Sequence, residues 1–123
     1  MSALPETAYQ TAFDAAPSAG SGTIIDIALG TLTHDAKVTA TCTFEADISG
    51  GSGLAWLLSN SPTEISEQAT IRTVAQHFSL SFVFTYDAGE SPTISLQGQG
   101  TGPPLGAVPV FTNVRLGLEL TYS

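Results

Sequence analysis

The chain has 123 residues, of which 11% are charged, and its 3 Lys and Arg stand against 11 Asp and Glu to give a formal net charge of −8. This length predicts one domain of ordinary size, and a hydrophobic content of 42% excludes a wholly disordered chain. The shortage of basic residues argues against binding to a phosphate backbone, so no nucleic acid is expected as a partner.

The first residues do not predict export or membrane insertion. Met1–Pro17 lacks the basic start and the apolar run of a secretory signal. No stretch approaches the roughly 20 apolar residues of a membrane span, so no membrane partner is expected. Cys42 is the single cysteine, which excludes an intrachain disulfide. We expect a soluble protein made in a cytoplasm.

The N-terminal segment has helical spacing. Apolar residues recur at three-to-five-residue steps between Leu4 and Ala16, which predicts a short amphipathic helix, and the small residues of Pro17–Gly22 predict a flexible joint. We therefore divide the chain into an arm, residues 1–22, and a body, residues 23–123. A helix this short is marginal alone, so the arm docks on its own body, pairs with copies or inserts into another protein; a frayed terminus is the alternative. Its candidate attachment residues are Leu4, Tyr9 and Phe13.

From Thr23 onward the apolar residues alternate with polar ones, as in strands with one buried face. Strong strands are predicted at Ile25–Leu29, Val38–Ile48, Phe78–Tyr86 and Val114–Tyr122, and weaker ones at Leu54–Ser59, Thr70–Val74 and Thr93–Gln97. The connections are too short for crossover helices, which predicts an all-β fold, an antiparallel β-sandwich of about eight strands. A rival local interpretation is one helical turn at Ser61-Pro62-Thr63-Glu64, which has the form of a capping box.

Catalytic and metal-binding patterns are weak. The chain has two histidines, His34 and His77, and no Gly-x-Ser-x-Gly elbow, so a hydrolase or isomerase is disfavoured and no enzyme is expected. One cysteine and two separated histidines cannot build a closed zinc site within the chain, although a ring of His or Asp on a threefold axis stays open. We expect no cofactor and no metal.

Four other side chains were considered for chemistry. Trp56 suggests a platform for stacking a sugar, but its apolar neighbours on both sides favour core packing. Cys42 shares a strand face with Val38 and Phe44, which predicts a buried hydrophobe rather than a reactive thiol. Glu45 and Asp47 lie two apart on one strand and are interpreted as solvated charges on its polar face.

The order of these strands resembles a known family. Thr39–Phe44, Leu54–Leu58, the turn Asp87-Ala88-Gly89-Glu90 and the final Asn113–Leu120 resemble the tumour necrosis factor and complement-type jelly roll, versions of which recur in phage head fibres, decoration proteins and tail tips. The resemblance spans roughly Thr23 to Ser123. It implies a homotrimer. The polar stretch Pro62–Gln68 and the long, Gly- and Pro-rich connection Gly98–Pro109 depart from the pattern.

The resemblance implies a non-enzymatic virion structural protein, of the capsid decoration or fibre type of a bacteriophage, assembled in the host cytoplasm. The arm would anchor a trimeric jelly roll to a capsid or tail protein of the same particle. The alternative is a receptor- or glycan-binding module that contacts a host surface through its loops. The candidate display residues are Gly50, Gly51, Ser52, Gly53, Asp87, Gly89, Glu90, Pro103 and Pro104.

Overall fold

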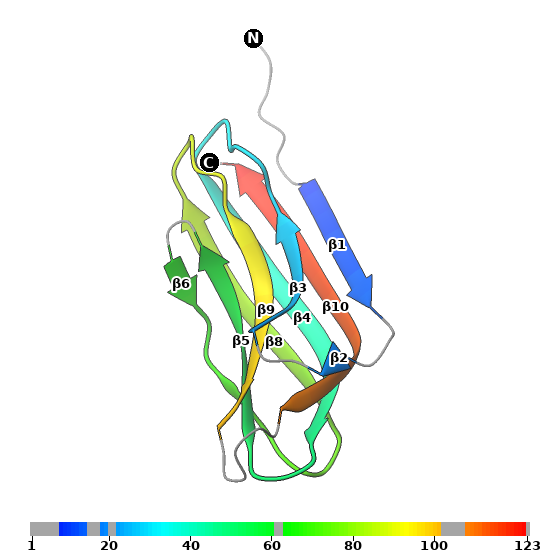
Figure 1. Cartoon of the computed structure of the whole chain (residues 1–123). Coiled ribbons are helices and arrows are strands. Elements are labelled where there is room, and N and C mark those ends of the chain that lie inside the picture. The colour runs from blue at the N-terminus through cyan, green and yellow to red at the C-terminus, as the bar shows by residue number, and fades with distance from the viewer. Residues whose placement is uncertain (1–7, 15–17, 20–21, 61–62, 102–107, 123) are drawn as a thin grey trace.

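The protein folds as two antiparallel β-sheets packed face to face (Figure 1). The computed structural model describes residues 8–14, 18–19, 22–60, 63–101 and 108–122. Sheet A has the strand order β1-β10-β4-β8, with β2 also paired to β10, and sheet B has the order β3-β9-β5-β6, with β7 also paired to β5. The strands are β1 (Ala8–Asp14), β2 (Ser18–Ala19), β3 (Gly22–Ala28), β4 (Ala36–Ile48), β5 (Gly53–Asn60), β6 (Thr63–Ile65), β7 (Ala69–Ile71), β8 (Gln76–Tyr86), β9 (Thr93–Gly100) and β10 (Pro109–Tyr122).

This arrangement confirms the predicted antiparallel jelly-roll sandwich. In the described part of the chain, β1 and β2 share one edge of sheet A and β6 and β7 share one edge of sheet B, so each sheet has four strand positions. The predicted total of about eight strands agrees with these positions. The chain crosses between the two sheets repeatedly, as Greek-key jelly rolls do.

The core lies between the sheets and is made by the alternation that the sequence predicts. Along β4 every second residue is buried, and the same holds for β10 on either side of its bulge. Each large apolar side chain removed from water contributes roughly 1.5–3 kcal/mol. The fully buried large side chains include Val38, Ile48, Leu57, Ile71, Phe84, Ile94, Leu96, Phe111, Val114 and Leu116.

The segment predicted as a helix is a strand where the structure describes it. Residues Ala8–Asp14 form β1, which pairs antiparallel with β10 from Ala8↔Leu120 to Asp14↔Val114. The open edge of β10 supplies backbone hydrogen-bond partners, and this tertiary pairing overrides the weak helical propensity of a short segment. The division into an arm and a body at residue 22 stays a prediction.

The alternative helical turn at Ser61–Glu64 is also wrong in its described part. Thr63 and Glu64 belong to β6 and pair with Asn60 and Ser59 of β5. Ser61 and Pro62 lie outside the described residues. Beyond β6, Ser66 continues the edge of β5: its amide donates to the carbonyl of Leu57 and its hydroxyl accepts from the amide of Leu57, both at 2.9 Å. In this polar stretch the amide and the hydroxyl of Ser66 thus take the hydrogen-bonding positions on Leu57 that a further strand residue would otherwise occupy.

The strand β10 begins earlier than its alternation predicts. Its register with β4 shifts between Thr112 and Arg115, and Asn113 has a φ of 53°. Phe111 and Val114 are both buried although they are three residues apart. One extra residue at the bulge therefore resets the period, and Asn is among the residues that tolerate this backbone region.

One buried hydrogen bond joins the two sheets. The hydroxyl of Tyr86 on β8 donates to the hydroxyl oxygen of Ser59 on β5 at 2.6 Å, and both residues are buried. Burial raises the pKa of Tyr86 to about 12, against the hydrogen bond to Ser59 that lowers it, with the nearby Glu64 and Glu90 carboxylates adding to the rise.

We predict that Tyr86→Phe lowers the free energy of unfolding by about 1–2 kcal/mol, because it leaves a buried hydroxyl at Ser59 without its partner. Ser59→Ala should lower the free energy of unfolding by a similar amount, because the buried hydroxyl of Tyr86 then loses its acceptor. Urea denaturation of the two single variants and the double variant tests the pair: the double loss should be clearly smaller than the sum of the single losses. Additive losses would contradict this account.

The thiol of Cys42 is fully buried on the inner face of β4, as predicted, and burial raises its pKa to about 12. An unfolded thiol ionises near pH 8.5. Above that pH the unfolded chain binds fewer protons than the folded chain, so stability is complete below about pH 8.5 and falls as pH rises toward 12.

We therefore predict that the free energy of unfolding decreases between pH 8 and about pH 10, and that Cys42→Ala flattens this decrease. Chemical denaturation at several pH values measures both slopes. The native thiol should also react with a thiol reagent at pH 8 far more slowly than the denatured chain. Equal slopes in the two proteins would rule out Cys42 as the cause.

Candidate functional site

The predicted display loops lie at opposite ends of the sandwich (Figure 1). At one end, the loop before β5 is tied to the end of β9: the amide of Thr101 donates to the carbonyl of Ser52 at 2.9 Å, and their hydroxyl groups lie 2.8 Å apart. Gly53 is a buried residue of β5, where an added Cβ would lie 3.0 Å from the backbone oxygen of Gln99. Pro103 and Pro104 lie outside the described residues. Gly50 and Gly51 precede β5 at this end.

At the other end, Asp87–Glu90 forms a tight turn between β8 and β9. The amide of Asp87 donates to Glu90 Oε1 at 3.0 Å, and Gly89, with a φ of 94°, donates to the carbonyl of Leu32 at 2.7 Å. The amide of Ala88 donates to Asp35 Oδ1 at 2.9 Å. These bonds fix the turn against the β3–β4 connection. The two groups of display residues therefore cannot form one continuous surface, and their role in display stays a prediction.

Two of the three candidate attachment residues lie on a described strand. Leu4 lies outside the described residues. Tyr9 and Phe13 belong to β1, opposite Glu119 and Arg115 of β10. Of the three arrangements expected for the arm, its described part Ala8–Asp14 shows the first, docking on its own body. Attachment through the arm stays a prediction.

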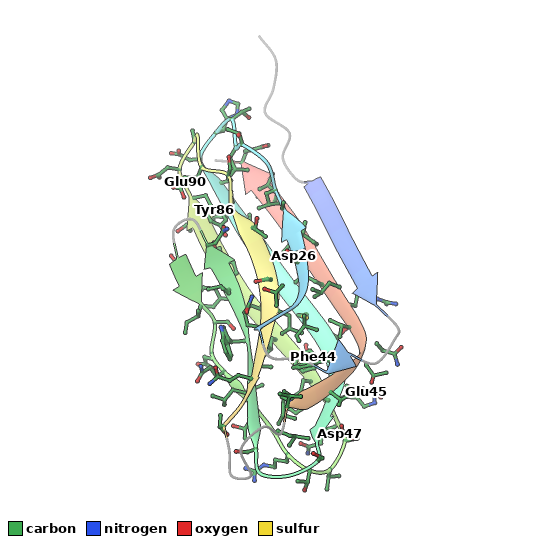
Figure 2. The ribbon with its side chains drawn as sticks, in the orientation of Figure 1. Asp26, Phe44, Glu45, Asp47, Tyr86 and Glu90 are labelled. Carbon is green, nitrogen blue, oxygen red and sulfur yellow. The ribbon has the colours of Figure 1, made fainter. Side chains whose placement is uncertain are left out.

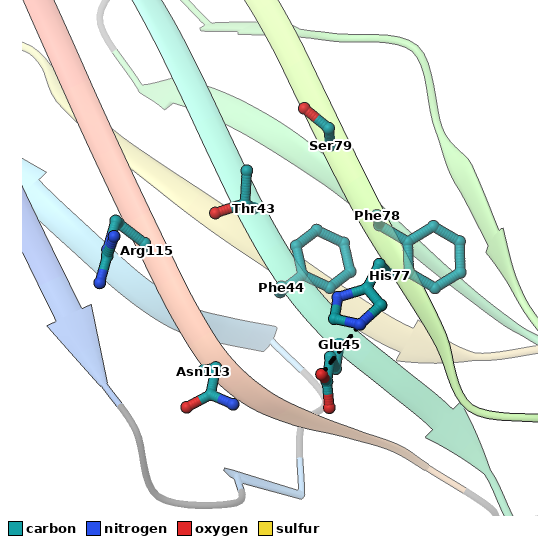
Figure 3. A pocket seen from close by; sticks show the side chains of 8 residues that line it. All are labelled: Thr43, Phe44, Glu45, His77, Phe78, Ser79, Asn113 and Arg115. Carbon is teal, nitrogen blue, oxygen red and sulfur yellow. Dashed lines mark ion pairs between the residues drawn. The ribbon is translucent and has the colours of Figure 1, made fainter.

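An open hollow of about 480 Å³ lies on sheet A beside the bulge in β10 (Figure 3). His77 Nε2 lies 3.1 Å from Glu45 Oε1, and the side chains of His77 and Glu45 are 86% and 40% exposed. Because both groups face water, their attraction is worth at most about 1 kcal/mol. The polar residues that line the hollow are Thr43, Glu45, His77, Ser79, Asn113 and Arg115.

The two histidines do not form one centre with a carboxylate. His34 lies in the β3–β4 connection, where its Nδ1 is 2.9 Å from the hydroxyl of Thr33 and its ring contacts that of Tyr122. His77 lies on β8 opposite Glu45, near the far end of the sandwich. Glu45 and Asp47 follow the polar face of β4, as predicted (Figure 2). Among the described residues, no group of three or more His, Cys, Asp or Glu gathers as a metal site.

The prediction that Trp56 packs in the core is wrong. Within β5, the buried positions belong to Gly53, Ala55, Leu57 and Ser59, whereas Leu54, Trp56 and Leu58 are only half-buried and do not join the core cluster. Successive residues of a strand point to opposite faces, so the indole lies on the outer face of sheet B. The signal in the sequence is that three of the four residues sharing one face of this strand, Gly53, Ala55 and Ser59, are small.

Trp56 has a polar neighbour on the next strand. It is directly opposite Gln97 of β9, and residues opposite each other in an antiparallel pair share a face. Gln97 Nε2 donates to the hydroxyl of Thr23 at 2.8 Å and to that of Ser95 at 2.7 Å. The side-chain amide is therefore held in place beside the indole. Asp26 of β3 is opposite Ser95 on this face.

The apolar part of this face continues toward β6. Leu58 is opposite Ile65, whose side chain is 49% exposed. We call the outward residues Leu54, Trp56, Leu58, Ile65, Ser95 and Gln97 the Trp56 face. It combines one large aromatic surface, aliphatic neighbours and an oriented amide.

Within the described ranges, no helix is long and apolar enough to cross a bilayer. No protein-family model matches the sequence. No curated protein matches it either.

Solved structures do resemble the fold. The C-terminal domain of EclA, described as a sugar-binding protein, is 15% identical, covers 93% of this chain and 81% of its own, and has a TM-score of 0.51. The globular domain of zebrafish complement 1qA is 6% identical over 96% of this chain and 97% of its own, with a TM-score of 0.51. The xylan-binding domain CBM22-1 of Paenibacillus barcinonensis Xyn10C is 8% identical over 94% of this chain and 83% of its own, with a TM-score of 0.50. At these identities the likeness shows the fold alone: a jelly roll of the kind found in complement-type and carbohydrate-binding domains.

Proposed function

We propose that the protein is a non-enzymatic binding module that holds a neutral polysaccharide on the Trp56 face. The observation that carries the proposal is the half-buried Trp56 on the outer face of sheet B, directly opposite the oriented amide of Gln97. Part of the indole surface of Trp56 faces solvent on this sheet and is available for stacking against a sugar ring.

A pyranose ring offers two kinds of surface, and the Trp56 face has a partner for each. The C–H groups of the ring are apolar and pack against an indole, which contributes a large rigid contact area. The hydroxyl groups around the ring both donate and accept hydrogen bonds. The amide of Gln97 uses its N–H groups on Thr23 and Ser95, so its carbonyl oxygen is the acceptor that it offers to a sugar hydroxyl.

The charge of the protein restricts the class of glycan. The net charge is −8, and Asp26 is exposed on the same outer face. Sulfated, sialylated or uronate-rich glycans would meet like charges here. A neutral glucan, xylan or mannan would not.

The shape of the site favours a polymer. The Trp56 face is built on adjacent strands of one sheet, so it contacts one side of a ligand rather than enclosing it. A single sugar would gain little from such a contact, because most small-ligand sites bury nearly all of their ligand. A polysaccharide places successive sugar units along the Trp56 face, from Gln97 to Ile65.

The comparisons support this class of function without defining the ligand. Two of the similar structures are described as a sugar-binding protein and a xylan-binding domain, and the compared complement domain shares the sandwich. The hollow at Glu45 and His77 does not favour catalysis, because its acid and base are exposed to water.

We predict that Trp56→Ala weakens binding to an insoluble neutral polysaccharide at least tenfold, which corresponds to about 1.4 kcal/mol. Depletion binding to cellulose, xylan and mannan measures the change, with heparin as the acidic comparison that should not bind. The wild-type protein has a single tryptophan, so a soluble oligosaccharide of the bound polymer should also shift its fluorescence.

One control variant and two test variants separate an effect on binding from an effect on folding. Val74→Ala removes a side chain that is 69% exposed in the β7–β8 connection, outside the Trp56 face, and should bind as the wild type does. Trp56→Phe keeps an aromatic surface and should retain part of the affinity, whereas Gln97→Leu should lose affinity at constant aromatic area. Thermal unfolding verifies that each variant is folded. Unchanged binding by Trp56→Ala, or binding of heparin in preference to neutral polymers, would exclude the proposal.

The virion role expected from the family resemblance is compatible with the same module. A jelly roll with an exposed glycan-binding face could serve a phage particle, with attachment through the arm and threefold association. The fold is shared with a complement-type domain. The phage origin, the homotrimer and the attachment to a capsid or tail protein stay predictions, and the mass measurement described below tests the trimer.

A further inference from the structure

We infer that two copies of the chain associate through the free edge of β8, pairing antiparallel about a twofold axis at Leu80. The strand β8 is the last strand of sheet A and pairs with β4 on one side only, from Ala36↔Tyr86 to Ala46↔Gln76. A strand at an edge presents a row of backbone N–H and C=O groups that a further strand satisfies.

The edge of β8 lacks the features that usually prevent such pairing. Its eleven residues, QHFSLSFVFTY, contain no Lys, Arg, Asp, Glu or Pro. Its register with β4 runs without a bulge. Native proteins protect exposed edges with charges, prolines, bulges or very short strands, so a long, regular and uncharged edge indicates a pairing surface.

The other strand edges in the described part of the chain are shorter than β8, and one of them is irregular. The strand β3 has an irregularity between Thr23 and Ile25 and carries the exposed Asp26. The opposite edge of sheet B consists of β6 and β7, with three residues each. The remaining edge of sheet A, β1, has seven residues and ends at Asp14. The contrast singles out β8.

The side chains of β8 fit a second copy of the same strand. Phe78, Leu80 and Phe82 point toward the core but are only half-buried, unlike Phe84 and Tyr86 further along. A hollow of about 440 Å³ lies beside them, lined by Ser66, Glu67, Ser79, Leu80, Ser81 and Phe82. The sandwich is therefore incompletely closed along this edge.

A twofold axis at Leu80 matches these three residues to themselves. Phe78 then lies opposite Phe82 of the second copy, Leu80 opposite Leu80, and Ser79 opposite Ser81. Between Phe78 and Phe82, apolar residues meet apolar ones on the inner side and serines meet on the outer side; beyond them His77 lies opposite Val83 and Gln76 opposite Phe84. Such an isologous contact is self-complementary and closed, so it gives a dimer rather than a filament.

Charge also favours a second copy at this edge. The chain carries a net charge of −8, and copies of an acidic protein repel each other at most orientations. The strand β8 carries no Lys, Arg, Asp or Glu, so pairing sets no carboxylate of one copy's β8 against the other's; the acidic groups beside this edge are Glu45, 3.1 Å from His77, and Glu67 in the hollow. We expect a modest affinity, because one strand pair buries less area than a standard interface.

Sedimentation of the full chain over a range of concentrations tests the dimer. The expected result is a concentration-dependent rise from 12.7 kDa toward twice that mass. Ser81→Lys should raise the dimer dissociation constant at least tenfold. The matched control is Thr41→Lys, which places the same charge on the neighbouring strand directly opposite Ser81 but away from the edge, and should leave the dimer intact.

A second pair of variants tests the register. Ser79→Lys with Ser81→Lys places lysines opposite lysines across the axis, and Ser79→Glu with Ser81→Glu places glutamates opposite glutamates. Each double variant should sediment as a monomer, and an equimolar mixture should form a heterodimer. Circular dichroism establishes that both are folded.

Three results would overturn the inference. The first is a wild-type chain that stays monomeric up to about 1 mM, the range of the weakest specific associations. The second is a trimer whose mass does not respond to Ser81→Lys, which would support the threefold assembly instead. The third is a dimer whose mass is changed neither by Ser81→Lys nor by Ser79→Lys combined with Ser81→Lys. None of these outcomes bears on polysaccharide binding, which depends on the other sheet.

Discussion

The structure depends on the uninterrupted alternation of β4. This strand lies inside sheet A and pairs with β10 on one side and β8 on the other. Its inward side chains, from Ala36 to Ile48, are all buried against sheet B, while its outward ones keep Thr, Glu and Asp in contact with water. A shift of one residue would exchange the two sets, so the apolar pattern fixes the register of the whole sheet. Both neighbours are aligned to β4: β10 with one shift at its bulge, and the edge strand β8 without a shift.

The same alternation places the candidate site, but in β5 the face with the larger side chains points outward, which the sequence alone does not indicate. In β5 the buried positions hold Gly53, Ala55, Leu57 and Ser59, and the larger side chains face outward. The inner face has small residues at three of these four positions, and sheet A contributes large buried side chains such as Phe84 and Phe111 to the same core. A rule that assigns large apolar residues to the core therefore misplaces Trp56. The polar partner Gln97 could not be found from the sequence, since the pairing of β5 with β9 joins residues 41 positions apart.

The fold itself was largely predictable, and its exceptions have local causes. Alternation located β4, β8 and most of β10, whose first residues were missed because the bulge at Asn113 changes the parity of the pattern. The segment Ala8–Asp14 was misassigned because helical spacing and strand pairing compete, and the edge of β10 decides the outcome. In the polar stretch near Ser66, a side-chain hydroxyl takes the place of a strand, which no periodicity can indicate.

The topology also sets how quickly such a protein acquires its structure. Sheet A joins Ala8 to Leu120, and sheet B joins Gly22 to Gly98, so most of the polypeptide must be collapsed before either sheet is complete. Chains dominated by distant pairings fold on the order of milliseconds to seconds rather than microseconds. During that interval an unguarded strand such as β8 stays accessible to other molecules. Because folding is slow and the edge of β8 is unpaired meanwhile, refolding at high protein concentration is prone to aggregation.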